Sequence, residues 1–519
     1  MMKKGHVEAA ADSILETKKV SQVYIHTGPV YRWVKLLVPD SCPLPTLLAD
    51  KVEDLKSKPI SPQETEGILQ EILTHFDNNG YPFAKVKLGN ILLKDSVAEA
   101  LLFIDIYNQI LFDSIAFAGE KVVSKEFLIQ YLGIKPGKPY NESLVLDAER
   151  KLNELAFLKN NRSPVVFFKE NKATLVLYLE KNKASNFDGI VGLAPASELT
   201  PGKLLLTGEA HLLLQNLFGK AYAFQLDYRN FRGSSQDVFL QATLPYLFKT
   251  QLGADVSQQL LKYDTNFFSS NSELGLRYQF NGNDYLKAFY RREAVNLLQF
   301  DTVAVLQFKT LPEFIDQSNN IYGLNLKRNR LNYRPNPTRG YSLDLVASAG
   351  LKHILENSYL KTLGLYDTLK LNNLQYRLQA NGKLCIPLGK SSTLFTQFSG
   401  SHLASPSIFA NELYRIGGIR TLRGYDEQSI LASTYLIGNV EYRYIIDRNS
   451  HAALFLNGAW WENHSRGLYK NGLPLGAGVG VNLQTKAGIL SLYYALPFSP
   501  GKQFEFRTGK VHFGVVNYF

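Results

Sequence analysis

The chain has 519 residues, of which 20% are charged and 45% hydrophobic. This apolar fraction excludes a disordered chain, and the length suits about two to four domains. The net charge is +11, but Lys and Arg are spread among Asp and Glu without a dense basic tract, so nucleic acid is not an expected partner. Cys42 and Cys385 are too few for a disulfide framework or a cysteine-based zinc site. We expect both to be small buried hydrophobes.

Membrane helices are excluded, because no stretch approaches 18 consecutive apolar residues. A transmembrane β-barrel stays open, since its strands need only about 9–11 residues that are apolar at alternate positions. Residues 1–6 are basic, but no apolar segment follows them, so a secretory signal is absent as written. Either the protein is not exported or its natural precursor begins elsewhere, and the patterns below favour the second reading.

Residues 1–182 combine helix and strand patterns. A helix-like stretch at 7–17 reads as a plug, a signal remnant or, in preference, a frayed terminus. A longer helix is expected after Ser61, which is a suitable N-cap with Pro62 behind it and Glu64 three positions on. The Asn-Asn-Gly sequence at 78–80 ends this helix.

An internal repeat is expected in this half. Strands are predicted at 83–88 and around 100–106 in the first unit, and the second unit is predicted to contain a strand at 110–119, a helix at 124–131, a helix capped by Asn141, and strands at 165–168 and 173–179. We interpret these as two strand–helix–helix–strand–strand units, at 21–107 and 108–182, after an extension at 1–20. Two unrelated α+β domains are the alternative.

From about residue 183 the hydrophobic period changes to two. At 273–280, for example, Leu, Leu, Tyr and Phe alternate with Glu, Gly, Arg and Gln. Similar alternation at 222–229 and 439–444, with a turn at 281–284, predicts antiparallel strands that are apolar on one face and charged on the other. Such a sheet suits lipid outside and water inside, and in lipid it must close on itself. About 21 residues for each strand and loop give about 16 strands, the first near 186–193 and the last at 511–519.

Six segments then become recognisable: 80–86, 136–141, 335–340 before a strand at 341–347, 416–425, 476–482 with 486–490, and 512–519. Together they resemble the BamA/TamA superfamily of outer-membrane assembly factors, over residues 21–519. The resemblance implies two α+β POTRA domains at 21–107 and 108–182, followed by a 16-stranded antiparallel transmembrane β-barrel of the bacterial surface antigen type at 183–519.

Leu422, Arg423, Gly424 and Tyr425 resemble the family's aliphatic-Arg-Gly-aromatic motif, at the tip of a loop folded into the barrel lumen. An Arg there is partly desolvated and needs a partner, and its planar fork suits a carboxylate or several carbonyls. The family's partner is an Asp, but Asn457 stands where we look for it. Strand alternation puts Glu441 on the lumen face beside Arg443, so Glu441 is our preferred partner. The alternative is an ordinary solvated Arg423.

The chain end resembles the family's carboxy-terminal β-signal, with Gly514 in place and Phe519 as the terminal aromatic residue. Asn517 departs from the pattern, which places an apolar or aromatic residue there. Its polar side chain weakens pairing at the seam between last and first strands, or it reflects simple variation at the membrane–water boundary.

Catalytic and metal-binding patterns are missing. The nine histidines form no HExxH motif, no Gly-x-Ser-x-Gly elbow occurs, and the Gly-rich run at 476–480 lies in a strand pattern rather than before a helix. We therefore expect no enzyme, no cofactor and no metal.

The resemblance implies a function as an outer-membrane assembly factor with its POTRA domains in the periplasm. Its expected partners are unfolded outer-membrane protein clients, outer-membrane lipid, and periplasmic or lipoprotein accessory subunits. A two-partner-type secretion pore is the first alternative, although we find no convincing plug helix with a linker. A porin-like channel follows, and an enzyme comes last.

Deleting Phe519 is predicted to reduce the protein's own insertion into the membrane, because the terminal aromatic residue completes the β-signal. Heat-modifiable electrophoretic migration of the truncated chain measures the folded fraction. Normal folding of that truncation would refute the role given to Phe519.

Overall fold

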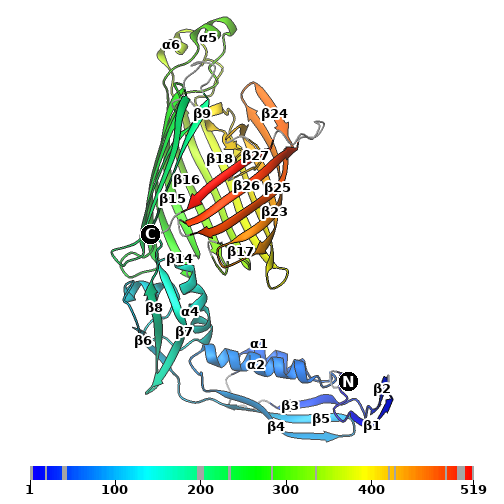
Figure 1. Ribbon diagram of the computed structural model, residues 1–519. Helices are drawn as coiled ribbons and strands as arrows, with labels where there is room; N and C mark the ends of the chain where they lie inside the picture. The colour runs from blue at the N-terminus through cyan, green and yellow to red at the C-terminus, as the bar shows by residue number, and fades with distance from the viewer. Residues whose placement is uncertain are drawn as a thin grey trace. The chain divides into compact units, whose positions relative to one another are not determined.

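The structure is a computed structural model that describes residues 4–17, 20–37, 44–195, 204–231, 235–281, 284–333, 336–418, 421–425, 428–485, 488–498 and 509–516 (Figure 1). Cys42, Asn517 and Phe519 lie outside these residues, as do parts of the segments at 335–340, 416–425 and 486–490. The chain divides into two compact units, one of them mostly amino-terminal and the other containing the large barrel. Each is described by itself.

The amino-terminal half contains two three-stranded sheets of the same topology. The first is formed by β3 (Arg32–Leu37), β4 (Lys85–Lys94) and β5 (Val97–Asp105), with α1 (Thr46–Glu53) and α2 (Pro62–Asn78). The second is formed by β6 (Leu111–Phe117), β7 (Leu158–Lys169) and β8 (Lys172–Lys181), with α3 (Lys125–Leu132) and α4 (Glu142–Glu154). The sheet orders are β3-β5-β4 and β6-β8-β7, and in each the first strand runs parallel to the central one. This shared topology supports the internal-repeat reading, whereas the exact domain limits stay predictions.

Side-chain caps fix where three of these helices begin. Ser61 accepts a hydrogen bond from the N–H of Glu64 at 3.4 Å, and Pro62 occupies the first helical position, where no N–H partner is needed. The Ser124 hydroxyl accepts from Phe127 at the start of α3, and Asn141 accepts from Leu144 at the start of α4. The predicted starts of these helices therefore follow from capping that is local in sequence.

The first sheet owes its stability to an apolar layer between strands and helices. Trp33, Ile72, Phe76 and Leu102 are buried within one cluster. The indole N–H of Trp33 donates to the hydroxyl of Thr65 on α2 at 3.4 Å, so its one polar atom is satisfied inside the core.

The helix-like reading of residues 7–17 is wrong. Residues 10–17 form strand β1 (Ala10–Thr17), which pairs antiparallel with β2 (Val20–His26). The Ala, Leu and Glu of this stretch favour a helix only weakly, by less than about 1 kcal/mol per residue, and the neighbouring strand overrides them.

The second half forms a closed barrel of long antiparallel strands (Figure 1). Its strands are β9 (Asn186–Pro195), β10 (Leu204–Leu217), β11 (Tyr222–Phe231), β12 (Ser235–Leu244), β13 (Leu252–Tyr263), β14 (Phe267–Asn281), β15 (Asp284–Leu297), β16 (Gln317–Asn329), β17 (Gly340–Ile354), β18 (Asn372–Pro387), β19 (Ser392–Ala404), β22 (Thr434–Ile445), β23 (His451–Ser465), β24 (Leu468–Gly472), β25 (Leu475–Thr485), β26 (Gly488–Phe498) and β27 (Lys510–Val516). Because β24 and β25 pair with successive parts of β23, they are two pieces of one strand. The described residues thus give 16 strands, as predicted, and β27 closes the circle against β9.

The predicted alternation has the expected outcome in space. Leu274, Leu276 and Tyr278 are 60%, 53% and 46% exposed on the outside of β14. Arg277 before Tyr278 and Gln279 after it are buried on the inner face. A register slip of one residue would exchange these faces, so the hydrophobic pattern fixes the register of the wall.

Loops at one end of the barrel carry the remaining short elements. These are α5 (Thr302–Phe308), α6 (Ser358–Thr362), the 3₁₀ turn η2 (Ala410–Glu412), β20 (Tyr414–Ile416) and β21 (Ile430–Ala432). Val305, Leu360 and Phe409 come from three different loops and share one buried apolar cluster. The loops therefore form a packed layer. In the described parts of the chain, no helix has the length and apolar character needed to cross a membrane.

Buried Glu154 gives α4 a predicted pH dependence. Burial raises the pKa of its carboxyl to about 7 from the ordinary 4.5, against the opposing effect of Arg150. The native state then holds a proton that the unfolded state has lost between these two values. The contribution of Glu154 to the free energy of unfolding is fully present below pH 4.5. It falls by about 3 kcal/mol as the pH rises through 7.

Hydrogen exchange of the α4 amides between pH 4.5 and 8 measures this effect, after correction for intrinsic exchange rates. The Glu154→Gln variant is expected to flatten the pH profile, while Glu149→Gln, on an exposed position of the same helix, leaves it unchanged. Identical profiles for the two variants would contradict the assignment to Glu154.

Candidate functional site in the barrel lumen

A long loop between β19 and β22 runs along the inner face of the barrel wall. Gly417 and Gly418 have φ values of +117° and +94°, which favour glycine, and they let the chain turn sharply after β20. The Thr421 hydroxyl closes this turn, since it donates to the carbonyl of Gly417 and accepts from its N–H, both at 2.8 Å. Leu422 is fully buried next to Ile437 of the wall. The turn thus presents Arg423 to the inner face.

The guanidinium of Arg423 meets a polar pair on β22. Its Nη2 lies 2.6 Å from Oε1 of Glu441 and 2.5 Å from Oδ1 of Asn439. Asn439 also donates to Oε1 of Glu441 at 2.9 Å. Arg443, two positions along the same strand, donates from Nε to Oε2 of Glu441 at 2.7 Å. One carboxylate therefore serves two guanidinium groups, and all four side chains are nearly buried.

Aromatic rings provide the rest of the guanidinium environment. The Arg423 guanidinium carbon lies 3.9 Å from the ring centre of Phe455 and 5.3 Å from that of Tyr493. Arg443 lies 3.6 Å from the ring centre of Phe395. A cation over a ring face gains about 0.5–2 kcal/mol, which offsets part of the excess positive charge.

The backbone of the motif is held as tightly as its side chain. Asn457 donates from its side-chain amide to the main-chain carbonyl of Arg423 at 3.3 Å. A side chain at Gly476 would place its Cβ 2.5 Å from the same carbonyl, so only glycine fits. Gly424 has a φ of +96°. The Tyr425 hydroxyl lies 2.7 Å from the carbonyl of Phe498 and 3.1 Å from that of Leu475.

A second contact attaches the same loop to β17, three strands away from β22 in the wall. Lys352 of β17 lies 2.6 Å from the carboxylate of Glu412, and both side chains are fully buried. The backbone N–H of Phe409 also donates to Glu412, at 3.0 Å. The loop is therefore tied to β17 through Glu412 and to β22 through Arg423.

Charged residues elsewhere on the inner wall are also paired with one another. Such pairs join Arg229 to Asp237, Arg277 to Asp255, Lys287 and Arg291 to Glu273, and Arg377 to Glu293. Pairing of this kind is required of charges that are partly removed from water.

The predicted motif residues are thus brought together, with Glu441 on the guanidinium and Asn457 on the backbone. Asn439, Phe455, Tyr493, Lys352 and Glu412 were missed. Alternation alone places Asn439 on the face of Glu441, whereas the other contacts depend on the path of the loop. Gly514 lies on β27 opposite Ser491, and Asn517 and Phe519 are outside the described residues. No group of three or more His, Cys, Asp or Glu in the described chain is arranged to hold a metal ion.

Two family models match the sequence. Residues 216–519 match the Omp85 superfamily domain, which is more than half of the chain, and residues 110–180 match the surface antigen variable number repeat, a POTRA model. No curated protein matches significantly.

Several solved structures are similar to this chain, and the two CdiB structures share its fold. CdiB from *Escherichia coli* is 15% identical, with a TM-score of 0.58 over 100% of this chain and 95% of that one. CdiB from *Acinetobacter baumannii* is 12% identical, with a TM-score of 0.57 over 98% and 95%. BamA from *Haemophilus ducreyi* lacking POTRA domains 1–3 is 18% identical, with a TM-score of 0.47 over 94% and 100%.

Removing Arg423 and removing Glu441 are predicted to lower the stability of the barrel by different amounts. Arg423→Ala leaves Glu441 paired with Arg443, so the loop around 417–425 loosens while the barrel stays folded. Glu441→Gln leaves two buried guanidinium groups without a carboxylate and is expected to cost about 3 kcal/mol or more.

Hydrogen exchange of the loop and urea unfolding in detergent separate these two effects. Arg292→Ala, on an exposed position of β15, is the matched control and should change neither. If Glu441→Gln unfolds at the same urea concentration as this control, the shared-carboxylate account is wrong.

Proposed function

The chain belongs to the Omp85 superfamily, and we propose that it is a non-enzymatic assembly factor of the bacterial outer membrane. In this proposal the α+β units lie in the periplasm and receive unfolded β-barrel clients. The barrel then passes client strands into the bilayer at the seam between β9 and β27. Periplasmic or lipoprotein accessory subunits would join it there.

The contacts of the lumen motif carry this proposal. Arg423 and its neighbours attach the loop to β22, β23, β25 and β26, the strands that lead up to the closing strand β27. The wall beside the seam is therefore braced from inside by these contacts. A braced wall next to a separable strand pair is the arrangement that lateral insertion needs.

An edge strand in the first α+β unit suits client binding. β4 lies at the edge of its sheet, and its outer part carries exposed Ile91, Leu92 and Leu93. An extended client can add to such an edge through main-chain hydrogen bonds, which tolerate many sequences. Folding of the client in the bilayer supplies the driving force, so no nucleotide is needed.

A two-partner-type secretion pore is the second candidate, and the charged inner wall favours it. An extended polar substrate requires a hydrated lumen, such as one lined by the ion pairs around Glu273 and Glu293. In that case the substrate passes along the barrel axis and the β9–β27 seam stays closed.

Closing the seam covalently is predicted to separate the two candidates. Cysteine pairs scanned between β9 and β27, in a background with Cys42→Ser and Cys385→Ser, are oxidised and tested for client insertion in reconstituted membranes. An insertase loses insertion when the seam is cross-linked and regains it on reduction, because the strands must separate.

The control pair is Gln258→Cys with Ser272→Cys, which lie opposite each other on β13 and β14, away from the seam. Oxidation of this pair should leave insertion intact. Unaltered client insertion through a fully cross-linked seam would overturn the insertase proposal, and continued export of an extended substrate would favour the pore.

A further inference from the structure

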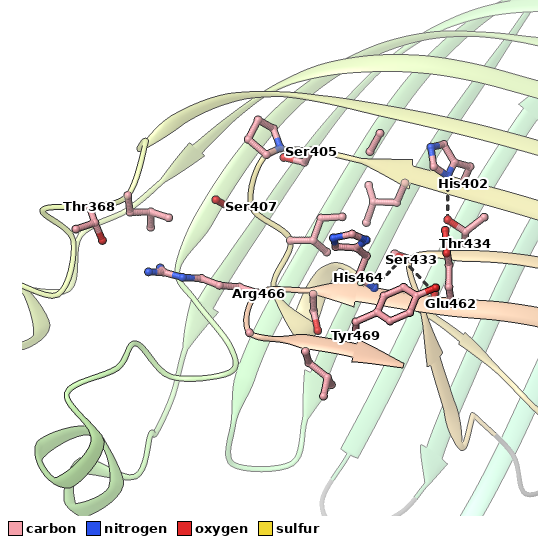
Figure 2. A pocket seen from close by; sticks show the side chains of 18 residues that line it. Thr368, His402, Ser405, Ser407, Ser433, Thr434, Glu462, His464, Arg466 and Tyr469 are labelled. Atoms are coloured by element: carbon pink, nitrogen blue, oxygen red, sulfur yellow. Dashed lines mark hydrogen bonds between the residues drawn. The ribbon is translucent and has the colours of Figure 1, made fainter. Parts of the chain in front are cut away.

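A row of polar side chains crosses the outward face of the barrel at the rim that carries the loops with α5 and α6. His402 of β19 lies directly opposite Thr434 of β22, which in turn lies opposite Glu462 of β23. The His402 ring nitrogen is 2.9 Å from the Thr434 hydroxyl. One step further along β23, His464 stands opposite Tyr469 of β24, and their rings meet edge to face at 5.7 Å. Figure 2 shows these side chains gathered around one pocket.

This row directly follows the apolar band of the wall. Leu436 and Trp460 lie opposite each other one step toward the middle of the barrel, and they are 55% and 44% exposed. Side chains two residues apart on a strand share a face and are separated by about 7 Å. The polar row therefore begins where the lipid-facing band ends, at the depth of lipid headgroups.

The strand directions identify the leaflet. β9 starts directly after the α+β units, and the strands alternate in direction, so the end of β19 lies at the opposite rim. With the α+β units in the periplasm, that rim faces the cell exterior. The outer leaflet is the lipid layer that this row meets.

The pocket itself has a volume of about 720 Å³ and is lined by polar and apolar groups from three loops. Arg466, at the exposed tip of the β23–β24 hairpin, lines it together with Ser407 and Thr368. Its backbone N–H donates to the carbonyl of Ile408 at 2.8 Å, which fixes the hairpin tip against the neighbouring loop. The Arg466 side chain is thus presented from an anchored backbone.

We propose that this pocket binds the phosphorylated sugar headgroup of an outer-leaflet glycolipid. Arg466 supplies cationic hydrogen-bond donors for the phosphate, and the ring of His464 on the same hairpin offers a further hydrogen-bonding nitrogen. The carboxylate of Glu462 and the hydroxyl of Thr434 suit sugar hydroxyls, and the ring of Tyr469 offers an apolar face. The acyl chains would lie on Trp460 and Leu436. A free sugar phosphate has no acyl chains and would leave this apolar surface unused.

Binding of bisphosphorylated lipid A to the full chain in detergent tests this site. Dephosphorylated lipid A, phosphatidylglycerol and inorganic phosphate serve as competing probes. Loss of one charged hydrogen bond costs about a factor of ten or more, so Arg466→Ala is expected to weaken lipid A binding at least tenfold. His464→Ala should also lower the affinity for lipid A.

Lys470→Ala is the matched control, because it removes the same charge from the same hairpin. Lys470 lies opposite Asn463, on the other face of the hairpin from His464, and its loss should change the affinity less than twofold. Heat-modifiable migration confirms that each variant is folded.

Equal losses for Arg466→Ala and Lys470→Ala would overturn the site, because they would indicate general charge attraction. Equal binding of dephosphorylated lipid A or of phosphatidylglycerol would overturn the headgroup assignment, and inorganic phosphate that competes at equal concentration would indicate a soluble anion instead. The site depends on barrel orientation but not on client insertion, so either proposal can fail without the other.

Discussion

Satisfaction of polar groups inside a wall that faces lipid is the constraint on which this structure depends. A sheet in hydrocarbon has no water for its backbone, so 16 strands must pair around a full circle, including β27 with β9. Closure then creates an interior whose charged side chains are also short of water. Most charges of the inner wall pair with a charge on the same or a nearby strand. The loop between β19 and β22 supplies two further partners, Glu412 for Lys352 and Arg423 for Glu441.

Two different solutions bind that loop to the wall. Lys352 and Glu412 form an ion pair with no net charge, and both side chains are fully buried. Loss of either partner therefore leaves the other as a buried charge. At the other end Glu441 is shared by Arg423 and Arg443, which leaves one positive charge to be balanced by Asn439 and by ring faces. The first contact is all-or-none. The second retains an Arg443–Glu441 pair when Arg423 is removed, so its loss leaves no unpaired carboxylate.

Period and local capping made much of this architecture predictable from the sequence. The rows around Leu274 and Tyr278, and the helix starts at Ser61 and Asn141, depend on neighbours within a few residues. Alternation was also sufficient to prefer Glu441 over Asn457 as the guanidinium partner. The contacts of Arg423 with Phe455 and Tyr493 were not predictable, because the three residues come from separate segments and meet only after the barrel closes.

The same limit explains the misread amino terminus and the unforeseen rim. Residues 10–17 contain helix-forming residues, yet pairing with β2 decides their conformation. At the rim, His402, Thr434 and Glu462 are far apart in sequence and form one row only through the registers of β19, β22 and β23. Their position is nonetheless a consequence of the period-two pattern, since each lies on the outward face of its strand. An alternation that continues past the lipid band must place polar side chains where headgroups begin, and the barrel wall thereby acquires a lipid-reading surface at its edge.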